Sequence, residues 1–291
     1  MTAISMSATI TIKKAGFPAT LWRRSIPRKS GQHRRCHNSM EEYIDTHCHL
    51  DAAEFTGRKA DVINDARQAG VNIFIVPGVS INDWQRLDNI AGLFPGVYTA
   101  PGVHPLFIAG LIPTEVTAAL EKQLIRSHVV AIGEIGLDGY QNSRDISSQF
   151  PFFTAQVELA ISARLPILLH IRKAHDIVLS TLRKLHYAQR GCGGVVHAYS
   201  GSLQQAEQYY QMGFLLGIGG ILCNPAARKI RNIVSQMPID ALVLETDAPY
   251  MRLEPKSIPT IVKCMAELRE EKRETLRQVI AENSRRIFKF L

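Results

Sequence analysis

The stretch Ile73-Phe74-Ile75-Val76 is an uninterrupted apolar run, and Ile167-Leu168-Leu169 is a second one. Strands that are buried on both faces have such sequences, because neither face meets water. Eight short segments of this character are spread along the chain, and each is predicted to form a strand. They are Tyr43–His47, Asn72–Pro77, Val97–Val103, Val129–Gly133, Pro166–His170, Gly194–His197, Phe214–Ile218 and Ala241–Thr246.

Helical patterns alternate with these strands. In residues 59–69, Ala60, Ile63 and Ala66 recur at intervals of three, and Gly70 follows as a helix stop. Similar patterns predict helices at 115–126, 152–164, 174–185, 203–212, 226–236, 258–270 and 274–290. Alternating strands and helices indicate an α/β fold with a parallel sheet wrapped by helices. Residues 40–291 are close in number to the roughly 250 of a (β/α)8 TIM barrel, which is the predicted architecture.

The positive charge of the chain is concentrated in an N-terminal extension. Residues 1–39 contain eight Lys or Arg and no acidic residue, whereas the net charge of the whole chain is +8. Residues 40–291 are therefore neutral overall, and their composition does not predict a basic barrel surface. We expect residues 1–39 to be disordered and residues 40–291 to form the barrel domain.

Three explanations of this extension stay open. Its Arg- and Ser-rich, acid-poor composition suits a targeting peptide. A disordered basic tail could instead contact nucleic acid. The third explanation is upstream sequence read from an early start codon, which the position of Met40 directly before the first predicted strand favours.

The cysteines and the hydropathy predict a cytoplasmic protein. No run of 18 apolar residues is present, so no transmembrane helix is expected. The five cysteines are odd in number, widely separated and without a C-x-x-C pair, which predicts unpaired thiols in a reducing compartment. They are Cys36, Cys48, Cys192, Cys223 and Cys264. Cys48 lies between two histidines on the opposite face of the strand and is expected to serve packing.

Candidate metal ligands follow five of the predicted strands. His47 and His49 form an H-x-H sequence. Residues two apart on a strand point to the same side, so both imidazoles can reach one ion. Each candidate alone has an ordinary explanation, such as a helix-starting acid for Glu134 or a turn residue for Asp247. Together they gather at the carboxyl end of the barrel strands, where catalytic residues of this fold lie. The predicted metal ligands are His47, His49, Glu134, His170, His197 and Asp247.

Four imidazoles and two carboxylates suit borderline divalent ions, so two ions of Zn²⁺, Mn²⁺ or Fe²⁺ are expected, with Mg²⁺ a further candidate. Glu134 is the natural bridge, because its strand lies between the two ligand groups. His47, His49 and Asp247 would complete the shell of one ion, and the two remaining histidines that of the other. Two ions about 3.5–4 Å apart activate water and hold the oxygens of a displacement at phosphorus. Asp247, with Glu134, is the predicted catalytic residue, acting as ligand and general base.

Several motifs resemble the TatD family of metal-dependent deoxyribonucleases and hydrolases, and within it the YjjV-type branch. Supporting stretches are Gly217-Ile218-Gly219-Gly220 and the closing Asn283-x-x-Arg286-x-Phe288. The principal motifs are Asp45-Thr46-His47-Cys48-His49-Leu50-Asp51, Gly102-Val103-His104-Pro105, Gly133-Glu134-Ile135-Gly136-Leu137-Asp138, His170-Ile171-Arg172, His197-Ala198-Tyr199-Ser200-Gly201 and Glu245-Thr246-Asp247-Ala248-Pro249.

The resemblance implies a metallo-dependent hydrolase TIM barrel, divalent metal, and DNase or related phosphoesterase activity. It carries metal roles onto the same six ligands. It also suggests that His104 either hydrogen-bonds substrate phosphate or orients the site, and that Arg172 either pairs with phosphate or forms a structural salt bridge. Two departures are the basic extension and the short segment 250–257 after Asp247, where relatives usually carry a longer polar loop.

Three classes of function are open from the sequence. The first is a phosphodiesterase, such as a 3′→5′ exonuclease on DNA, although no stripe of aromatic and basic residues is evident. The second is hydrolysis of a small amide, lactone or phosphoester. The third is a scaffold tethered to nucleic acid by residues 1–39, which would leave six gathered ligands unexplained. The expected partner is DNA or a small phosphoester without a membrane, and a monomer is plausible.

Overall fold

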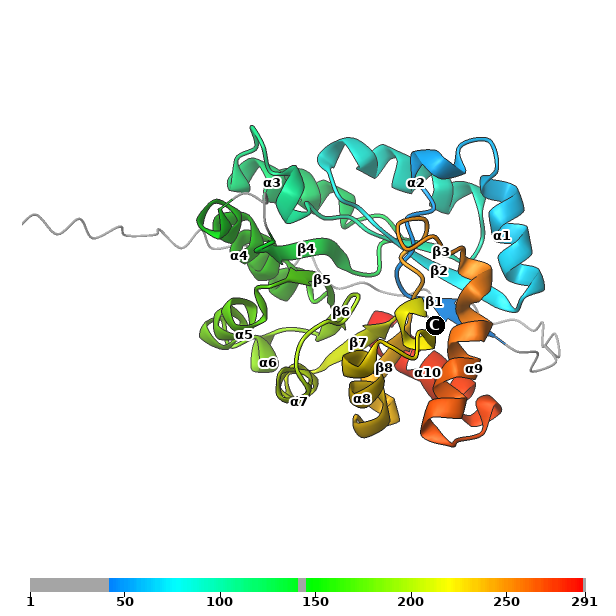
Figure 1. Ribbon diagram of the computed structural model, residues 1–291. Helices are drawn as coiled ribbons and strands as arrows, with labels where there is room; N and C mark the ends of the chain where they lie inside the picture. Colours follow the sequence, from blue (N-terminus) through cyan, green and yellow to red (C-terminus); the bar gives the residue numbers. More distant parts are fainter. Residues whose placement is uncertain (1–41, 141–144, 290–291) are drawn as a thin grey trace, which may run out of the picture. The chain divides into compact units, whose positions relative to one another are not determined.

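The computed structural model describes residues 42–140 and 145–289, so the predicted extension 1–39 lies outside the described residues. Ten helices of the described chain surround eight strands (Figure 1). The strands are β1 (Tyr43–Asp45), β2 (Val71–Pro77), β3 (Val97–Ala100), β4 (Ile132–Asp138), β5 (Ile167–Arg172), β6 (Gly194–Val196), β7 (Phe214–Ile218) and β8 (Leu242–Leu244). The helices are α1 (Lys59–Gln68), α2 (Trp84–Leu93), α3 (Pro113–Gln123), α4 (Ile146–Ala163), α5 (His175–Lys184), α6 (Tyr187–Arg190), α7 (Leu203–Gln211), α8 (Arg228–Gln236), α9 (Ile258–Arg269) and α10 (Arg273–Phe288).

The strands close into a barrel. Two parallel ladders run β1-β2-β3 and β4-β5-β6-β7-β8. The backbone N–H of Val130 donates to the carbonyl of Thr99 at 3.0 Å and joins the ladders beside β3. At the other junction, the N–H of Thr46 donates to the carbonyl of Leu244 at 2.9 Å. The prediction of a (β/α)8 barrel is confirmed.

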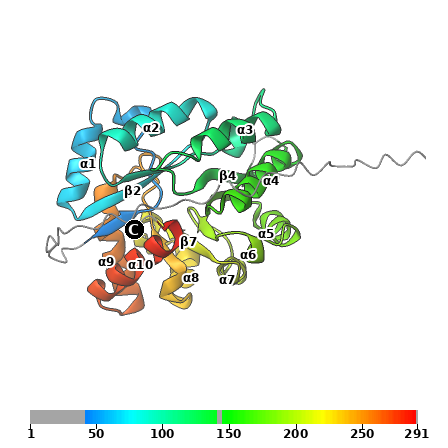
Figure 2. The ribbon, with the colours of Figure 1, turned by 180° about the vertical axis from the view of Figure 1, so that it is seen from behind.

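Two apolar layers hold the barrel together. Inside it, Ile44, Ile75 and Leu168 belong to one buried cluster that also contains Ile287 and Phe288 of α10. Helix α10 therefore closes the amino-terminal end of the barrel, and Figure 2 shows it across the centre of the barrel from that side. Outside it, the apolar faces of the surrounding helices pack against the strands. The opposite end of the barrel, at the carboxyl ends of the strands, is not covered by α10.

The predicted bounds of β4 are wrong. The strand runs over Ile132–Asp138 rather than ending at Gly133, so Glu134 lies within it. Its register against β5 shifts between Ile132 and Ile135. Gly133 lies against Leu168, where an added Cβ would come within 2.5 Å of that side chain. The glycine thus allows the close approach with which β4 continues past Glu134.

Helix α2 was not predicted, although its sequence carries a usable signal. Trp84, Leu87 and Ile90 recur at intervals of three and are all buried. The indole Nε1 of Trp84 donates to the carbonyl of Gly102 at 3.1 Å and ties the helix to the chain after β3. Helix α6 was not predicted either, because its four residues are too few to show a helical pattern.

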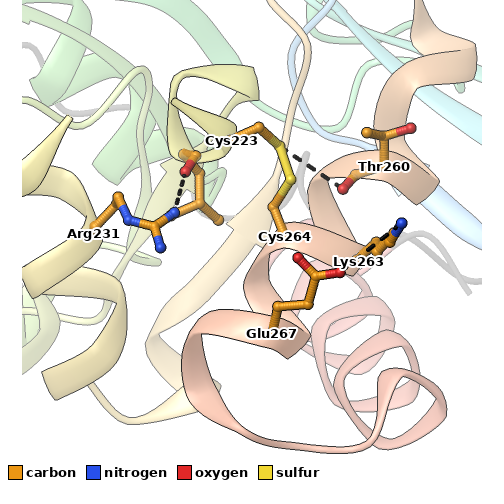
Figure 3. Close-up of a disulfide and its surroundings, with 7 residues drawn as sticks. Cys223, Arg231, Thr260, Lys263, Cys264 and Glu267 are labelled. Carbon is orange, nitrogen blue, oxygen red and sulfur yellow. Dashed lines mark hydrogen bonds and ion pairs between the residues drawn. A yellow bond between two sulfur atoms is a disulfide. The ribbon is translucent and has the colours of Figure 1, made fainter. Parts of the chain in front are cut away.

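The prediction that all cysteines are unpaired is wrong. Cys223, at the end of the 3₁₀ turn Gly220–Cys223, forms a disulfide with Cys264 of α9 (Figure 3). The two residues are 41 apart in sequence, and their Cα atoms are brought to 5.4 Å by the packing of α9 against the turn after β7. Cys48, which is fully buried, and Cys192 are free thiols, whereas Cys36 lies outside the described residues.

None of the helices within residues 42–140 and 145–289 combines the length and hydropathy that a membrane-spanning helix needs.

Candidate metal centre

His47 and His49 follow β1 at the carboxyl end of the barrel and are almost fully buried. Their Nε2 atoms lie 3.2 Å apart, so both imidazoles converge on one point. The backbone holds them beside the chain that follows β8. The N–H of Asp247 donates to the carbonyl of His47 at 2.9 Å, and the N–H of His49 donates to that of Ala248 at 2.8 Å. As a result, Asp247 Oδ1 is 3.5 Å from His49 Nε2.

Glu134 lies between two groups of imidazoles. Its Oε2 is 3.3 Å from His47 Nε2 and 3.7 Å from His49 Nε2. Its Oε1 is 2.9 Å from His170 Nδ1 on the other side. The carboxylate is 3 % exposed and presents one oxygen to each group, which is the geometry that a bridging ligand requires.

His170, on β5, is held by two acids. While Nδ1 faces Glu134, Nε2 lies 3.1 Å from Oδ2 of the buried Asp138. With an ion bound, a proton on Nε2 would donate to Asp138 and leave the lone pair of Nδ1 for the ion beside Glu134. Acids in this outer position fix the tautomer of metal-binding histidines in proteins. Asp138 stands in the Gly133–Asp138 motif, but the sequence alone gave it no role.

His197 follows β6 and has a similar outer acid. Its Nδ1 is 3.0 Å from Oε1 of Glu245, an electrostatic contact rather than a well-aligned hydrogen bond. Glu245 is 1 % exposed, and the N–H of Ala198 donates to it at 2.6 Å. A Cβ on Gly217 would meet Glu245 at 2.0 Å, so the glycine makes room for the acid. The opposite nitrogen of His197, Nε2, is 3.7 Å from Asp247 Oδ2.

His104 lies on the same side of the centre as His170. Its Nδ1 accepts a hydrogen bond from the N–H of Leu106 at 3.1 Å, and its Nε2 is 3.8 Å from Glu134 Oε1. Burial lowers the pKa of His104 to about 3, although Glu134 opposes the shift. The ring is thus neutral, and because Nδ1 accepts, the proton is on Nε2. His104 therefore presents a hydrogen-bond donor to the centre.

The acids of the centre are ionised. Burial alone would raise the pKa of Glu134, but its electrostatic interaction with His47 and its hydrogen bond with His170 outweigh burial and hold the pKa well below its usual range. Asp247 behaves likewise, since the surrounding histidines lower its pKa against the effect of burial. Burial also lowers the pKa of His197, yet Glu245 and Asp247 raise it more strongly, to about 10.

Asp45 is a further buried acid, and it contacts the backbone segments that carry the ligands. Asp45, at the end of β1, accepts hydrogen bonds from the hydroxyl of Thr246 at 2.5 Å and from the N–H of His47 at 3.2 Å. Burial raises its pKa to about 8 despite these bonds. Asp45 thereby clamps the ligand-bearing segments after β1 and β8 together. This role of Asp45 was not predicted from the sequence.

The six predicted ligands, together with His104, form three groups, and within each group the donor atoms lie within 4.8 Å of one another. They are His47 with His197 and Asp247, His47 with His49 and Glu134, and His104 with Glu134 and His170. Mixed imidazole and carboxylate donors are those of borderline divalent ions. The residues therefore fit a metal centre, and all six predicted ligands are brought together by the fold.

Arg172 is the other residue that was predicted to contact substrate. It follows His170 by two residues at the end of β5, is exposed, and places its guanidinium 3.7 Å from the ring centroid of Tyr140. Lys173 approaches the same ring at 4.8 Å. Among the described residues Arg172 forms no ion pair, and the choice between a phosphate partner and a structural salt bridge stays a prediction.

Comparison with known proteins agrees with this geometry. A family model described as TatD related DNase matches residues 44–289. The metal-dependent hydrolase YjjV of Escherichia coli is 35% identical over 257 residues, which cover 84% of this chain and 97% of YjjV. A protein of Erwinia billingiae named 3′-5′ ssDNA/RNA exonuclease TatD is 32% identical over 260 residues, which cover 84% of this chain and 98% of that protein.

Solved structures agree as well. The crystal structure of Escherichia coli YjjV has a TM-score of 0.80 at 35% identity and covers 85% of this chain and 98% of that one. A hydrolase of the TatD family from Entamoeba histolytica shares the fold, with a TM-score of 0.73 at 22% identity. The match covers 85% of this chain and 98% of that one. The predicted family, fold and hydrolase class are therefore confirmed, and the protein belongs to the TatD family of metal-dependent hydrolases.

Proposed function

We propose that the protein hydrolyses phosphodiester bonds of single-stranded nucleic acid from the 3′ end, using two divalent ions. The observation that carries this proposal is the position of Glu134, which offers one oxygen to each of two imidazole groups. His47, His49 and Asp247 would hold one ion, and His170 with His197 the other. Two such ions supply Lewis acidity and lower the pKa of a water molecule toward neutrality.

Asp247 and His104 have complementary tasks in this proposal. Asp247 is ionised and reaches the centre with a side chain that is 16% exposed, so it can take the proton of the attacking water. His104 is neutral and directs its Nε2–H inward, where it would donate to a non-bridging phosphate oxygen. The donor would stabilise the charge that grows on phosphorus oxygens during the displacement.

Two observations support nucleic acid as the substrate class. The relative from Erwinia billingiae is named as an exonuclease on single-stranded DNA and RNA. In addition, Tyr140 from the segment after β4 lies under Arg172 from the end of β5. An aromatic ring beside cations is a feature of surfaces that bind single strands. Arg172 would pair with a phosphate of the bound strand, because it lies only two residues after His170 on the same β-strand.

The proposal also includes a cytoplasmic location and a monomeric state. Nucleic acid as substrate supports the location. The disulfide between Cys223 and Cys264 argues against it, because thiols in that compartment are kept reduced. Alkylation of free thiols in intact cells will decide: labelling of both cysteines supports the cytoplasm, whereas protection of both contradicts it.

The activity is tested with the full chain after removal of metal by a chelator. Cleavage of a single-stranded DNA oligomer and of an aryl phosphodiester is measured after separate addition of Mg²⁺, Mn²⁺ or Zn²⁺. His170→Ala should abolish cleavage, whereas His128→Ala, on the outside of the barrel beside Asp88, should retain it. Failure of the wild type to cleave DNA with any ion would overturn the nuclease proposal, and cleavage of the aryl ester alone would indicate a small phosphoester.

A further inference from the structure

A cavity of about 480 Å³ opens beside Asp247. Its walls come from three segments at the carboxyl end of the barrel, which are residues 198–201 after β6, residues 219–230 after β7 and residues 245–251 after β8. The cavity therefore shares Asp247 with the candidate metal centre. A phosphodiester held at that centre would have room to place one of its two substituents in the cavity.

The walls of the cavity are mainly apolar. Ile221 and Met251 form part of its sides and are 45% and 50% exposed, while Ala226 and Ala227 lie at the start of α8. Small ligand sites have volumes of roughly 300–1,000 Å³ and mostly apolar linings with few polar groups. The volume has room for a nucleobase with its sugar, and the apolar lining can contact the faces of the base.

The cavity has a floor. Ile230 and Ile233 of α8 line it and are 8% and 1% exposed, because their side chains belong to the apolar layer between helices and barrel. A strand of nucleic acid that entered the cavity could not continue through this layer. The backbone of a strand therefore cannot pass through the cavity, which suits it to hold a terminal nucleotide.

The rim of the cavity is basic. Arg228 and Lys229 both contribute to the lining, and neither forms an ion pair with any residue in the described parts of the chain. Lys229 Nζ donates to the carbonyl of Ser200 at 2.6 Å and so spans the cavity from α8 to the segment after β6. Two cations beside an apolar hollow complement a ligand that joins a base to a phosphate backbone.

We propose that this cavity binds the 3′-terminal base of a single strand whose last phosphodiester lies at the metal centre. The inference rests on the proposed function, and it adds the element that restricts cleavage to a chain end. Because apolar walls meet the faces of the base, all four bases are accepted. Removing the base while keeping the sugar and phosphate removes the contacts with the cavity but not those with the centre.

The test compares two DNA oligomers of equal length, one ending in a normal 3′ nucleotide and the other in an abasic tetrahydrofuran nucleotide. The wild-type chain with Mn²⁺ should show a kcat/KM about tenfold higher for the normal end, the usual weight of one stacked base. Ala227→Trp, which occupies the part of the cavity next to α8, should bring the ratio of the two values close to one. Ala118→Trp, on the exposed face of α3, should leave the ratio at its wild-type value.

Three outcomes would overturn the inference, and they are distinguishable. Equal rates on both oligomers in the wild type would show that the terminal base is not bound. An unchanged ratio in a folded Ala227→Trp protein would place the base elsewhere, and Ala226→Trp, which lines the same cavity, takes its place if that variant does not fold. Absence of cleavage of both oligomers would defeat the proposed function itself, and this inference with it.

Discussion

Replacing Asp247 by asparagine separates the proposed proton transfer from the integrity of the fold. Asp247 has a backbone φ of +53°, in the left-handed region that asparagine adopts more readily than most residues. Asparagine also keeps the shape of the side chain and one oxygen, which can remain near His49 Nε2, now at 3.5 Å. Asp247→Asn should therefore fold and retain most of the metal.

The expected loss lies in turnover. The carboxylate is ionised, because the neighbouring histidines lower its pKa, and the amide of asparagine cannot take a proton from water. A general base contributes about 10²–10⁴ to the rate, so kcat should fall by that factor while KM changes little. In free energy this is roughly 3–5 kcal/mol, since each factor of ten in rate corresponds to about 1.4 kcal/mol.

The assay is steady-state cleavage of single-stranded DNA at saturating Mn²⁺, with metal content measured on the same samples. Asp61→Asn, an exposed change on α1, is the matched control and should keep full activity. A metal-replete Asp247→Asn protein with a kcat within a factor of three of the wild type would refute the assignment of Asp247 as the base.

Three further predictions concern the centre and its framework. Asp138→Asn should weaken metal binding at His170 by about 10–100-fold in a chelator competition, because an outer partner of a metal-binding histidine is lost. Cys264→Ser should lower the free energy of unfolding by about 4 kcal/mol in urea titrations without reductant, since it opens a loop of 41 residues closed by Cys223; an unchanged midpoint would contradict this. In the metal-free protein, the pKa of His197 rises from 6.5 to about 10. Its contribution to stability is complete below about pH 6.5 and should be lost as the pH rises through about 10, by at most about 5 kcal/mol, whereas metal-loaded protein should not show this loss.

The strands were predictable because parallel strands buried on both faces leave a clear sequence signal. Ile73–Val76 and Ile167–Leu169 both lie within observed strands. The end of β4 was not predictable in the same way, because it depends on the close approach that Gly133 permits to Leu168. Helix α2 is the opposite case, since the spacing of its buried residues Trp84, Leu87 and Ile90 is a helical pattern that the sequence itself contains.

The gathering of the six candidate ligands was predictable from their positions at strand ends, although their roles as ligands stay predictions. The outer acids were not predictable. Which carboxylate reaches which imidazole depends on register, as where Gly136 of β4 pairs with His170 of β5 and leaves Asp138 beside its ring. The disulfide was also not predictable from the sequence, because only the packing of α9 on the turn after β7 brings Cys223 to Cys264.

The central claim is a pair of ions bridged by Glu134, and anomalous diffraction from crystals of the Mn²⁺-loaded protein tests it most directly. We predict two manganese peaks per chain, about 3.5–4 Å apart, with one oxygen of Glu134 directed at each. Glu134→Gln crystals should lose one or both peaks. A single peak in the wild type, or two peaks that Glu134 does not join, would contradict the account.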